Sequence, residues 1–111
     1  MEMSFASRGM QKACSIAKET RRKWGVELAR RLQQRLMELK AAETLADISH
    51  LPPARCHELT GDRVGQFSVD LIHPYRLLFT PDHDSTPRKP DGGVERSEVT
   101  KILVLEVCDT H

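Results

Sequence analysis

Hydrophobic residues recur with the period of an α-helix in the first half of the chain. Between Val26 and Ala42 four leucines are spaced by four, four and three residues and so share one helical face: Leu28, Leu32, Leu36 and Leu39. A shorter helix is expected from about Gly9 to Lys18, after a short strand at residues 2–6. The pair Pro52-Pro53 ends any helix, because proline lacks a backbone N–H and disfavours a helical residue before it.

After the prolines the pattern changes to the period of a β-strand. Polar and apolar residues alternate over residues 66–71, and the alternation returns over residues 75–79, where Arg76 is expected to point away from the face of Tyr75, Leu77 and Phe79. Residues 56–59 could form a further short strand. The almost continuously apolar run 102–107 predicts a strand buried in the middle of a sheet.

A long irregular segment separates the last two predicted strands. Residues 81–98 contain three of the six prolines and the pair Gly92-Gly93, which predicts a mobile loop. The order of elements predicts a single α+β domain over residues 1–111, with two N-terminal helices packed on one face of a small, mainly antiparallel twisted sheet. The other face of the sheet is then left for function.

Charge is distributed unevenly, although the net charge is only +1. Residues 1–40 carry ten lysine or arginine residues against four glutamates, a net charge of +6, and the remainder carries −5. Such a distribution is typical either of a basic face that binds nucleic acid or of solvated helix surfaces. The candidate RNA-binding residues are Arg21, Arg22, Lys23, Arg30, Arg31 and Arg35.

The composition excludes several classes of protein. No apolar run approaches the ~20 residues that span a bilayer, and the first residues lack the apolar stretch of a secretory signal, so we expect a cytoplasmic protein that binds no membrane. Cys14, Cys56 and Cys108 are irregularly spaced and fit neither a disulfide framework nor a zinc site. We interpret them as structural thiols and expect no metal or other cofactor.

Several short segments together resemble a known family. These are Gly61-Asp62-Arg63, Gly65-Gln66-Phe67-Ser68, Tyr75-Arg76-Leu77 and the closing Asp109-x-His111, with an Asp-Gly-Gly loop before the last strand. In this order they resemble the RelE/ParE superfamily of bacterial toxins, in particular its HigB-like branch of plasmid-maintenance killer proteins. The resemblance covers most of the chain, from the basic helix to the end.

The resemblance implies a type II toxin, a metal-independent endoribonuclease that cuts messenger RNA on the ribosome and so inhibits translation. Its partners would be the ribosome, mRNA and a cognate antitoxin. Such antitoxins are usually helix-turn-helix proteins, and the toxin would contact operator DNA only through this partner. Arg63, Arg76 and His111 match the basic loop, the strand arginine and the terminal histidine of the family.

The chemistry of RNA cleavage gives these three side chains plausible roles. Metal-free cleavage removes a proton from the 2′-hydroxyl, stabilises the charge on the phosphorane and protonates the 5′-oxygen that leaves. Arg63 and Arg76 suit the phosphate charge, because guanidinium is always protonated and offers a fork of donors. His111 suits general acid catalysis, because its own α-carboxylate and nearby Asp109 favour the imidazolium.

Strict alternation along the last strand creates a geometric difficulty. It places His111 on the same face as Leu103, Leu105 and Val107, whereas Arg76 is expected on the other face. A twist or bend is therefore expected near Asp109.

Other interpretations of the same residues stay open. Arg76 could serve only as an ion-pair partner of Asp70 or Glu58, and Arg63 could be a solvated turn residue. The chain also differs from HigB-like relatives, which tend to have lysine at the positions of Thr60 and Val64 and tyrosine at that of Thr110. These differences remove two cations and a phenol, so cleavage is expected to be reduced, differently organised or absent.

Two other functions are therefore alternatives. One is a ParE-like toxin that inhibits a protein target such as DNA gyrase without performing chemistry, and the other is a family member that only binds its antitoxin.

Overall fold

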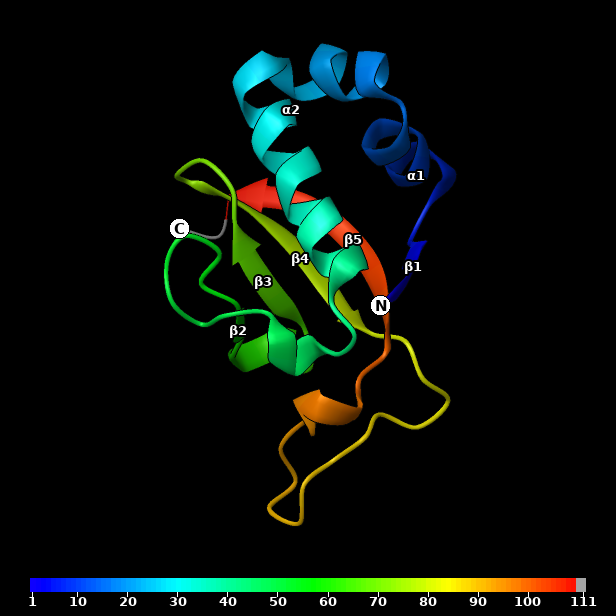
Figure 1. Ribbon diagram of the computed structural model, residues 1–111, viewed down its shortest axis with the longest axis vertical. Coiled ribbons are helices and arrows are strands. Elements are labelled where there is room, and N and C mark those ends of the chain that lie inside the picture. The colour runs from blue at the N-terminus through cyan, green and yellow to red at the C-terminus, as the bar shows by residue number, and fades with distance from the viewer. Residues whose placement is uncertain (110–111) are drawn as a thin grey trace.

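The computed structural model describes residues 1–109, and two helices lie across one face of a five-stranded sheet (Figure 1). The first three elements are β1 (Glu2–Phe5), α1 (Arg8–Ser15) and α2 (Ala17–Ala41). The later strands are β2 (His57–Glu58), β3 (Phe67–Asp70), β4 (Tyr75–Pro81) and β5 (Lys101–Asp109). Short 3-10 helices occupy three of the connections: Leu45–Asp47, Gly61–Arg63 and Arg96–Glu98.

The sheet has the order β1-β5-β4-β3-β2. Strand β5 pairs in parallel with β1, and the other neighbouring strands are antiparallel. The predicted α+β fold, with helices on one face of a mainly antiparallel sheet, is confirmed.

The helices begin and end differently from the prediction. Ser7 caps α1, since its side chain accepts a hydrogen bond from the Met10 N–H at 3.0 Å. The chain leaves helical geometry at Ile16 and resumes it at once, so residues 17–24 belong to α2 although no helix was predicted over most of them. Gly25, with φ of 81°, kinks α2 between this basic first part and the leucine-bearing second part.

The predicted leucine face packs against the sheet. Leu28, Leu32, Leu36 and Leu39 are all buried and form one cluster with side chains of β3, β4 and β5. Phe67 and Phe79 stack beneath them with ring centroids 6.0 Å apart. We call this side of the sheet the helix face, and Figure 1 shows α2 running across it.

The opposite side, which we call the Arg76 face, carries Ser68, Asp70, Arg76, Leu78, Thr80, Glu106 and Cys108. Cross-strand pairing aligns these residues: Asp70 with Arg76, Arg76 with Cys108, and Leu78 with both Ser68 and Glu106. The sequence left this side for function, and the structure shows that it is partly covered, because Ser68 and Leu78 are fully buried. The Thr80 hydroxyl donates to the Gly65 carbonyl at 2.9 Å and holds the β2–β3 connection over this part of the sheet.

The last strand does depart from strict alternation, but not near Asp109, where the departure was expected. Phe79 pairs with Val104 whereas Leu78 pairs with Glu106, so Leu105 is an extra residue that shifts the phase of β5. As a result Val107 faces the helices with Ile102 and Val104, while Leu103 lies on the opposite side. The irregularity occurs at Leu105, and β5 stays paired as far as Asp109.

The segment between β4 and β5 is irregular over most of its length, as predicted, and extends away from the sheet in Figure 1. It is anchored by Val94 and Val99, which are both buried in the main core, and by a bridge between Arg88 and Val94. Its mobility stays a prediction. Among residues 1–109, no helix is long and apolar enough to cross a membrane.

Candidate functional site

Arg76 lies near the start of β4, and its side chain emerges on the Arg76 face. Its Nε lies 3.4 Å from Oδ1 of Asp70, the residue opposite on β3. This is one of the two ion pairs that the sequence left open for Arg76. The contact involves Nε and neither of the two terminal nitrogens of the guanidinium.

Arg63 approaches the same face from the β2–β3 connection. It ends the short 3-10 helix Gly61–Arg63, and its Nη1 donates to Oε1 of Gln66 at 3.3 Å. Arg63 lies close enough to β5 for its charge to lower the pKa of Cys108, the cross-strand partner of Arg76. Arg76 is thus the strand neighbour of Cys108, and Arg63 lies near enough for its charge to act on the same residue.

The surroundings of the Cys108 thiol favour its protonated form. Partial burial raises the pKa of Cys108, and a hydrogen bond to the Glu106 carboxylate and that negative charge raise it further, against the opposing effect of Arg63. A thiol with a raised pKa stays protonated at neutral pH and reacts poorly. Glu106 itself is exposed beside it and can accept a proton.

A third arginine adjoins Asp70, and sequence reasoning missed it. Nη1 of Arg55 lies 3.5 Å from Oδ2 of Asp70, so this one carboxylate lies between Arg55 and Arg76. Arg55 has a left-handed φ of 49°, and it follows the Pro52-Pro53 pair. Its location depends on this backbone turn, for which the sequence carries no periodic signal.

Two sequence-based expectations fall outside the residues that the structure describes. His111, the proposed general acid, and Thr110, where relatives tend to have tyrosine, both follow Asp109, the last described position. Of the three predicted catalytic residues, the structure therefore brings two together, Arg63 and Arg76. Asp70 was foreseen only as a possible partner of Arg76, and Glu106 was missed, although its polar side chain in an apolar strand was a usable signal.

Most of the predicted RNA-binding residues lie at the surface of α2, but one does not. Arg21, Arg22, Lys23 and Arg30 are exposed and Arg31 is half-buried. Arg35 is only 1% exposed, and the expectation that it contacts RNA is wrong. Its Nε donates to the Asp70 carbonyl at 2.8 Å and its Nη1 to Glu38 at 3.0 Å. Arg35 therefore links α2 to the end of β3.

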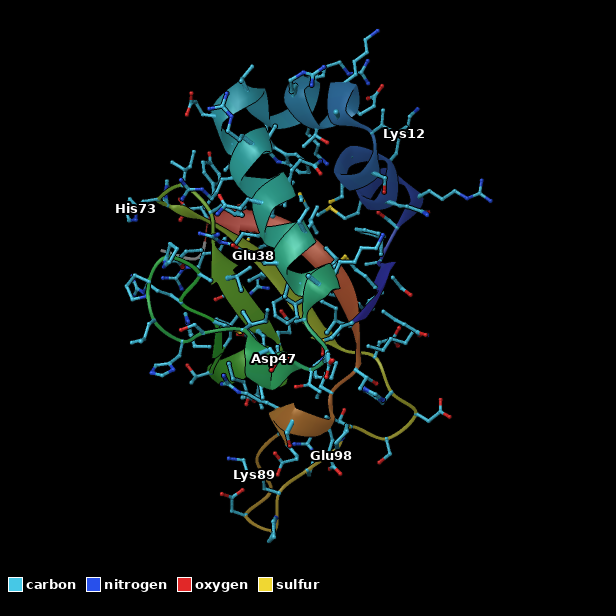
Figure 2. All side chains as sticks on the ribbon, viewed as in Figure 1. Lys12, Glu38, Asp47, His73, Lys89 and Glu98 are labelled. Atoms are coloured by element: carbon cyan, nitrogen blue, oxygen red, sulfur yellow. The ribbon has the colours of Figure 1, made fainter. Side chains whose placement is uncertain are left out.

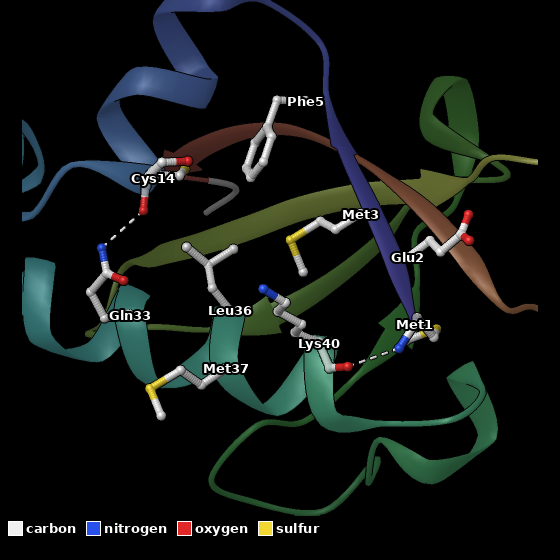
Figure 3. A pocket seen from close by; sticks show the side chains of 10 residues that line it. Met1, Glu2, Met3, Phe5, Cys14, Gln33, Leu36, Met37 and Lys40 are labelled. Atoms are coloured by element: carbon white, nitrogen blue, oxygen red, sulfur yellow. Dashed lines mark hydrogen bonds between the residues drawn. The ribbon is translucent and has the colours of Figure 1, made fainter.

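A separate groove of about 790 Å³ lies on the other side of the molecule, between β1, α1 and α2 (Figure 3). Its lining combines apolar side chains, among them Met3, Phe5 and Leu36, with charged groups of Glu2, Lys40 and the Met1 ammonium. Gln33 donates to the Cys14 carbonyl at 3.0 Å at one end. The groove lacks the paired guanidinium groups of the Arg76 face, and we do not assign RNA cleavage to it.

Two of the three cysteines lie inside the protein core. Cys14 and Cys56 are buried free thiols, which agrees with a structural role. Across the described part of the chain, no three His, Cys, Asp or Glu residues are grouped closely enough to hold a metal ion.

Comparisons with known proteins identify the fold. No protein-family model and no curated protein sequence matches the chain. Among solved structures, a YoeB/ParE toxin from Agrobacterium tumefaciens is similar, with a TM-score of 0.60 and 9% identity over the whole length of both chains. The chain has the fold of these toxins.

Two structures from Staphylococcus aureus agree with this similarity. A YoeB-YefM complex matches with a TM-score of 0.57 and 11% identity, and a YoeB dimer matches with a TM-score of 0.55 and 14% identity. In both cases the match covers 100% of this chain and 97% of the other.

Proposed function

We propose that this protein is a type II toxin of the HigB-like branch, which cuts mRNA on the ribosome and is neutralised by a cognate antitoxin. The observation that carries the proposal is that Arg76 lies opposite Cys108 in the sheet and that the charge of Arg63, from the β2–β3 connection, acts on the same residue. Two guanidinium groups on one face suit a phosphodiester, whose charge increases in the transition state. The similarity of fold to YoeB and ParE toxins supports the toxin class.

In the proposed mechanism, Arg63 and Arg76 hold the scissile phosphate and stabilise the phosphorane charge. Glu106 accepts the 2′-hydroxyl proton, since its carboxylate is exposed on the same face. His111 donates a proton to the leaving 5′-oxygen, the role that the family resemblance implies. No metal or cofactor takes part in these steps.

The basic surface of α2 has a separate role in this proposal. Arg21, Arg22, Lys23, Arg30 and Arg31 bind ribosomal RNA through phosphates, which positions the toxin without reading sequence. This contact weakens with added salt, because each phosphate that is neutralised releases counterions. Arg35 is excluded from it by its burial.

The proposal also includes partners and location. One structure with the same fold is a complex of YoeB with YefM, and by analogy we propose that a cognate antitoxin covers the Arg76 face. The antitoxin is expected to be a helix-turn-helix protein and to provide the only link to operator DNA. A protein that acts on ribosomes would work in the cytoplasm.

A ParE-like inhibitor of a protein target is the alternative, and one observation favours it. Arg76 is paired with Asp70, and a structural ion pair would need no RNA. In that case the Arg76 face would carry no chemistry, and His111→Ala would leave toxicity intact.

The proposed function is tested by inducing the protein in cells and mapping 5′ ends on a reporter mRNA. A matched reporter without a start codon serves as the control, because it is transcribed but not translated. New 5′ ends confined to the translated reporter support the proposal. Growth arrest with both messages intact would favour the ParE-like alternative.

A further inference from the structure

We propose that a hollow at one end of the sheet binds a single nucleotide of the RNA next to the bond that is cut. This inference rests on the proposed RNA-cleaving function. The hollow has a volume of about 300 Å³ and is lined by Pro52, Pro53, Arg55, His73, Tyr75 and Arg76. That volume is at the lower end of the ~300–1,000 Å³ typical of small-ligand pockets, which suits one nucleotide better than a longer segment.

The electrostatics of the hollow favour a phosphate group. Asp70 lines it between Arg55 and Arg76, so two guanidinium groups share one carboxylate and one positive charge is left over. The two ion-pair distances, 3.5 and 3.4 Å, exceed the ~2.7–2.9 Å of a tight charge-assisted hydrogen bond. Oδ1 of Asp70 is buried without a hydrogen bond among the described residues. Donors of both arginines therefore stay available to a phosphate.

The remaining lining suits a nucleobase. Tyr75 is 43% exposed, and accessible aromatic rings are platforms on which bases stack. Pro52 and Pro53 add apolar surface without a backbone N–H that would require a partner. His73 lies at the outer edge of the β3–β4 turn (Figure 2), where it can contact ribose or phosphate.

The hollow is continuous with the candidate site through Arg76. This residue lines the hollow, and it is also the cross-strand partner of Cys108, beside which Arg63 lies. A strand whose scissile phosphate is bound by Arg63 and Arg76 would extend past Arg76 into the hollow. Tyr75 and Arg55 are then positioned to contact the adjoining nucleotide, so the hollow would influence which sequences are cut.

The test is a titration of the isotope-labelled full chain, followed by backbone amide NMR signals, with 5′-AMP, adenosine and inorganic phosphate in separate experiments. We expect saturable shifts at residues 54–55 and 70–76 with 5′-AMP, and weaker binding of adenosine or phosphate alone. Arg55→Gln should weaken 5′-AMP binding about tenfold through loss of a charged contact. Tyr75→Ala should weaken it roughly tenfold through loss of stacking, whereas Tyr75→Phe should bind normally.

Arg8→Gln is the matched control, because Arg8 is an exposed arginine of α1 remote from the hollow, and its binding should equal that of the wild type. The inference is overturned if 5′-AMP shifts none of these amides, or if phosphate alone binds as tightly as the nucleotide. It is also overturned if Arg55→Gln and Tyr75→Ala cut ribosome-bound mRNA at the wild-type rate and at the same positions, a result that leaves the proposed function standing. Binding of 5′-AMP in the hollow of a protein that cuts no RNA would support the nucleotide site and contradict the proposed function instead.

Discussion

Oδ1 of Asp70 lies 3.4 Å from Nε of Arg76, and the two residues face each other across β3 and β4. The other oxygen of this carboxylate lies 3.5 Å from Nη1 of Arg55. The Asp70 backbone carbonyl accepts a hydrogen bond from the buried Arg35 of α2. Asp70 thus connects the helix layer to the arginines of the candidate site and fixes the direction in which Arg76 leaves the sheet.

Asp70→Asn should distinguish the positioning of Arg76 from the binding of the RNA phosphate. The amide keeps the shape of the side chain but removes the negative charge that orients Arg76, so we expect kcat for RNA cleavage to fall about tenfold. KM should fall as well, because a phosphate no longer competes with a carboxylate. Steady-state kinetics on ribosome-bound mRNA measure both. Asp82→Asn, which removes a looser pairing with Lys101 at 3.9 Å, is the control, and equal kcat values for the two variants would contradict this role.

Glu106→Gln should remove the proposed general base. General bases typically contribute 10²–10⁴-fold, so we expect kcat to fall roughly a hundredfold or more. Single-turnover cleavage of ribosome-bound mRNA measures this rate. Glu98→Gln, in the segment before β5, provides a matched control (Figure 2). Equal cleavage rates for Glu106→Gln and Glu98→Gln would assign the base to another group.

Arg35→Ala should reduce stability rather than RNA binding. Its side chain is 1% exposed, and its truncation opens a cavity and leaves the Asp70 carbonyl without its donor. A loss on the order of 3 kcal/mol in the free energy of unfolding follows, measured by chemical denaturation. Arg30→Ala, at the exposed surface of the same helix, should change stability by less than ~0.5 kcal/mol but lessen the salt dependence of ribosome binding. The opposite pattern in the two variants would refute this division of roles.

The buried thiols should make the fold sensitive to alkaline pH. Burial raises the pKa of Cys56 from 9.0 to about 11, and burial likewise raises that of Cys14 to about 11, with small opposing effects of Arg96 and Lys23. Between these values the unfolded thiol has lost its proton and the folded thiol has not. The free energy of unfolding should therefore be unaffected by these groups below pH 9 and should fall as the pH rises towards 11.

Equilibrium denaturation of the wild type and Cys56→Ala between pH 8 and 11 tests this effect, because the other titrating groups are common to both proteins. The variant should be less stable at pH 8 but should lose less stability over the alkaline range. If the free energy of unfolding fell equally with pH in both proteins, the Cys56 thiol would not contribute to the loss of stability at alkaline pH.

The elements that could be predicted from the sequence are those in which buried residues recur at the regular spacing of a helix or a strand. The leucine spacing of α2 and the alternation in β3 and β4 reflect contact with one core, and both were correct. The first part of α2 was missed because its basic run has no apolar stripe. It is held through Thr20, a fully buried residue whose hydroxyl donates to the Ile16 carbonyl at 3.0 Å and also to that of Ala13.

The burial of Arg35 was within reach of the sequence. Arg35 follows Leu32 by three residues and precedes Leu39 by four, which places it on the leucine face rather than the basic one. The position of the phase shift at Leu105 could not be predicted from the sequence, because a bulge inserts one residue without altering the apolar character of the strand. The location of Arg55 also depends on tertiary structure, namely on a left-handed residue after Pro52-Pro53.

The central claim is that Arg63 and Arg76 hold a phosphodiester for cleavage. The most direct measurement is the rate at which purified protein cuts mRNA on programmed ribosomes, compared among the wild type, Arg76→Gln, Arg63→Gln and the control Arg8→Gln. We predict cleavage by the wild type and by Arg8→Gln, and a loss of roughly a hundredfold in each of the other two proteins, which should remain folded. Intact mRNA with the wild-type protein, or equal rates in all four proteins, would contradict the account.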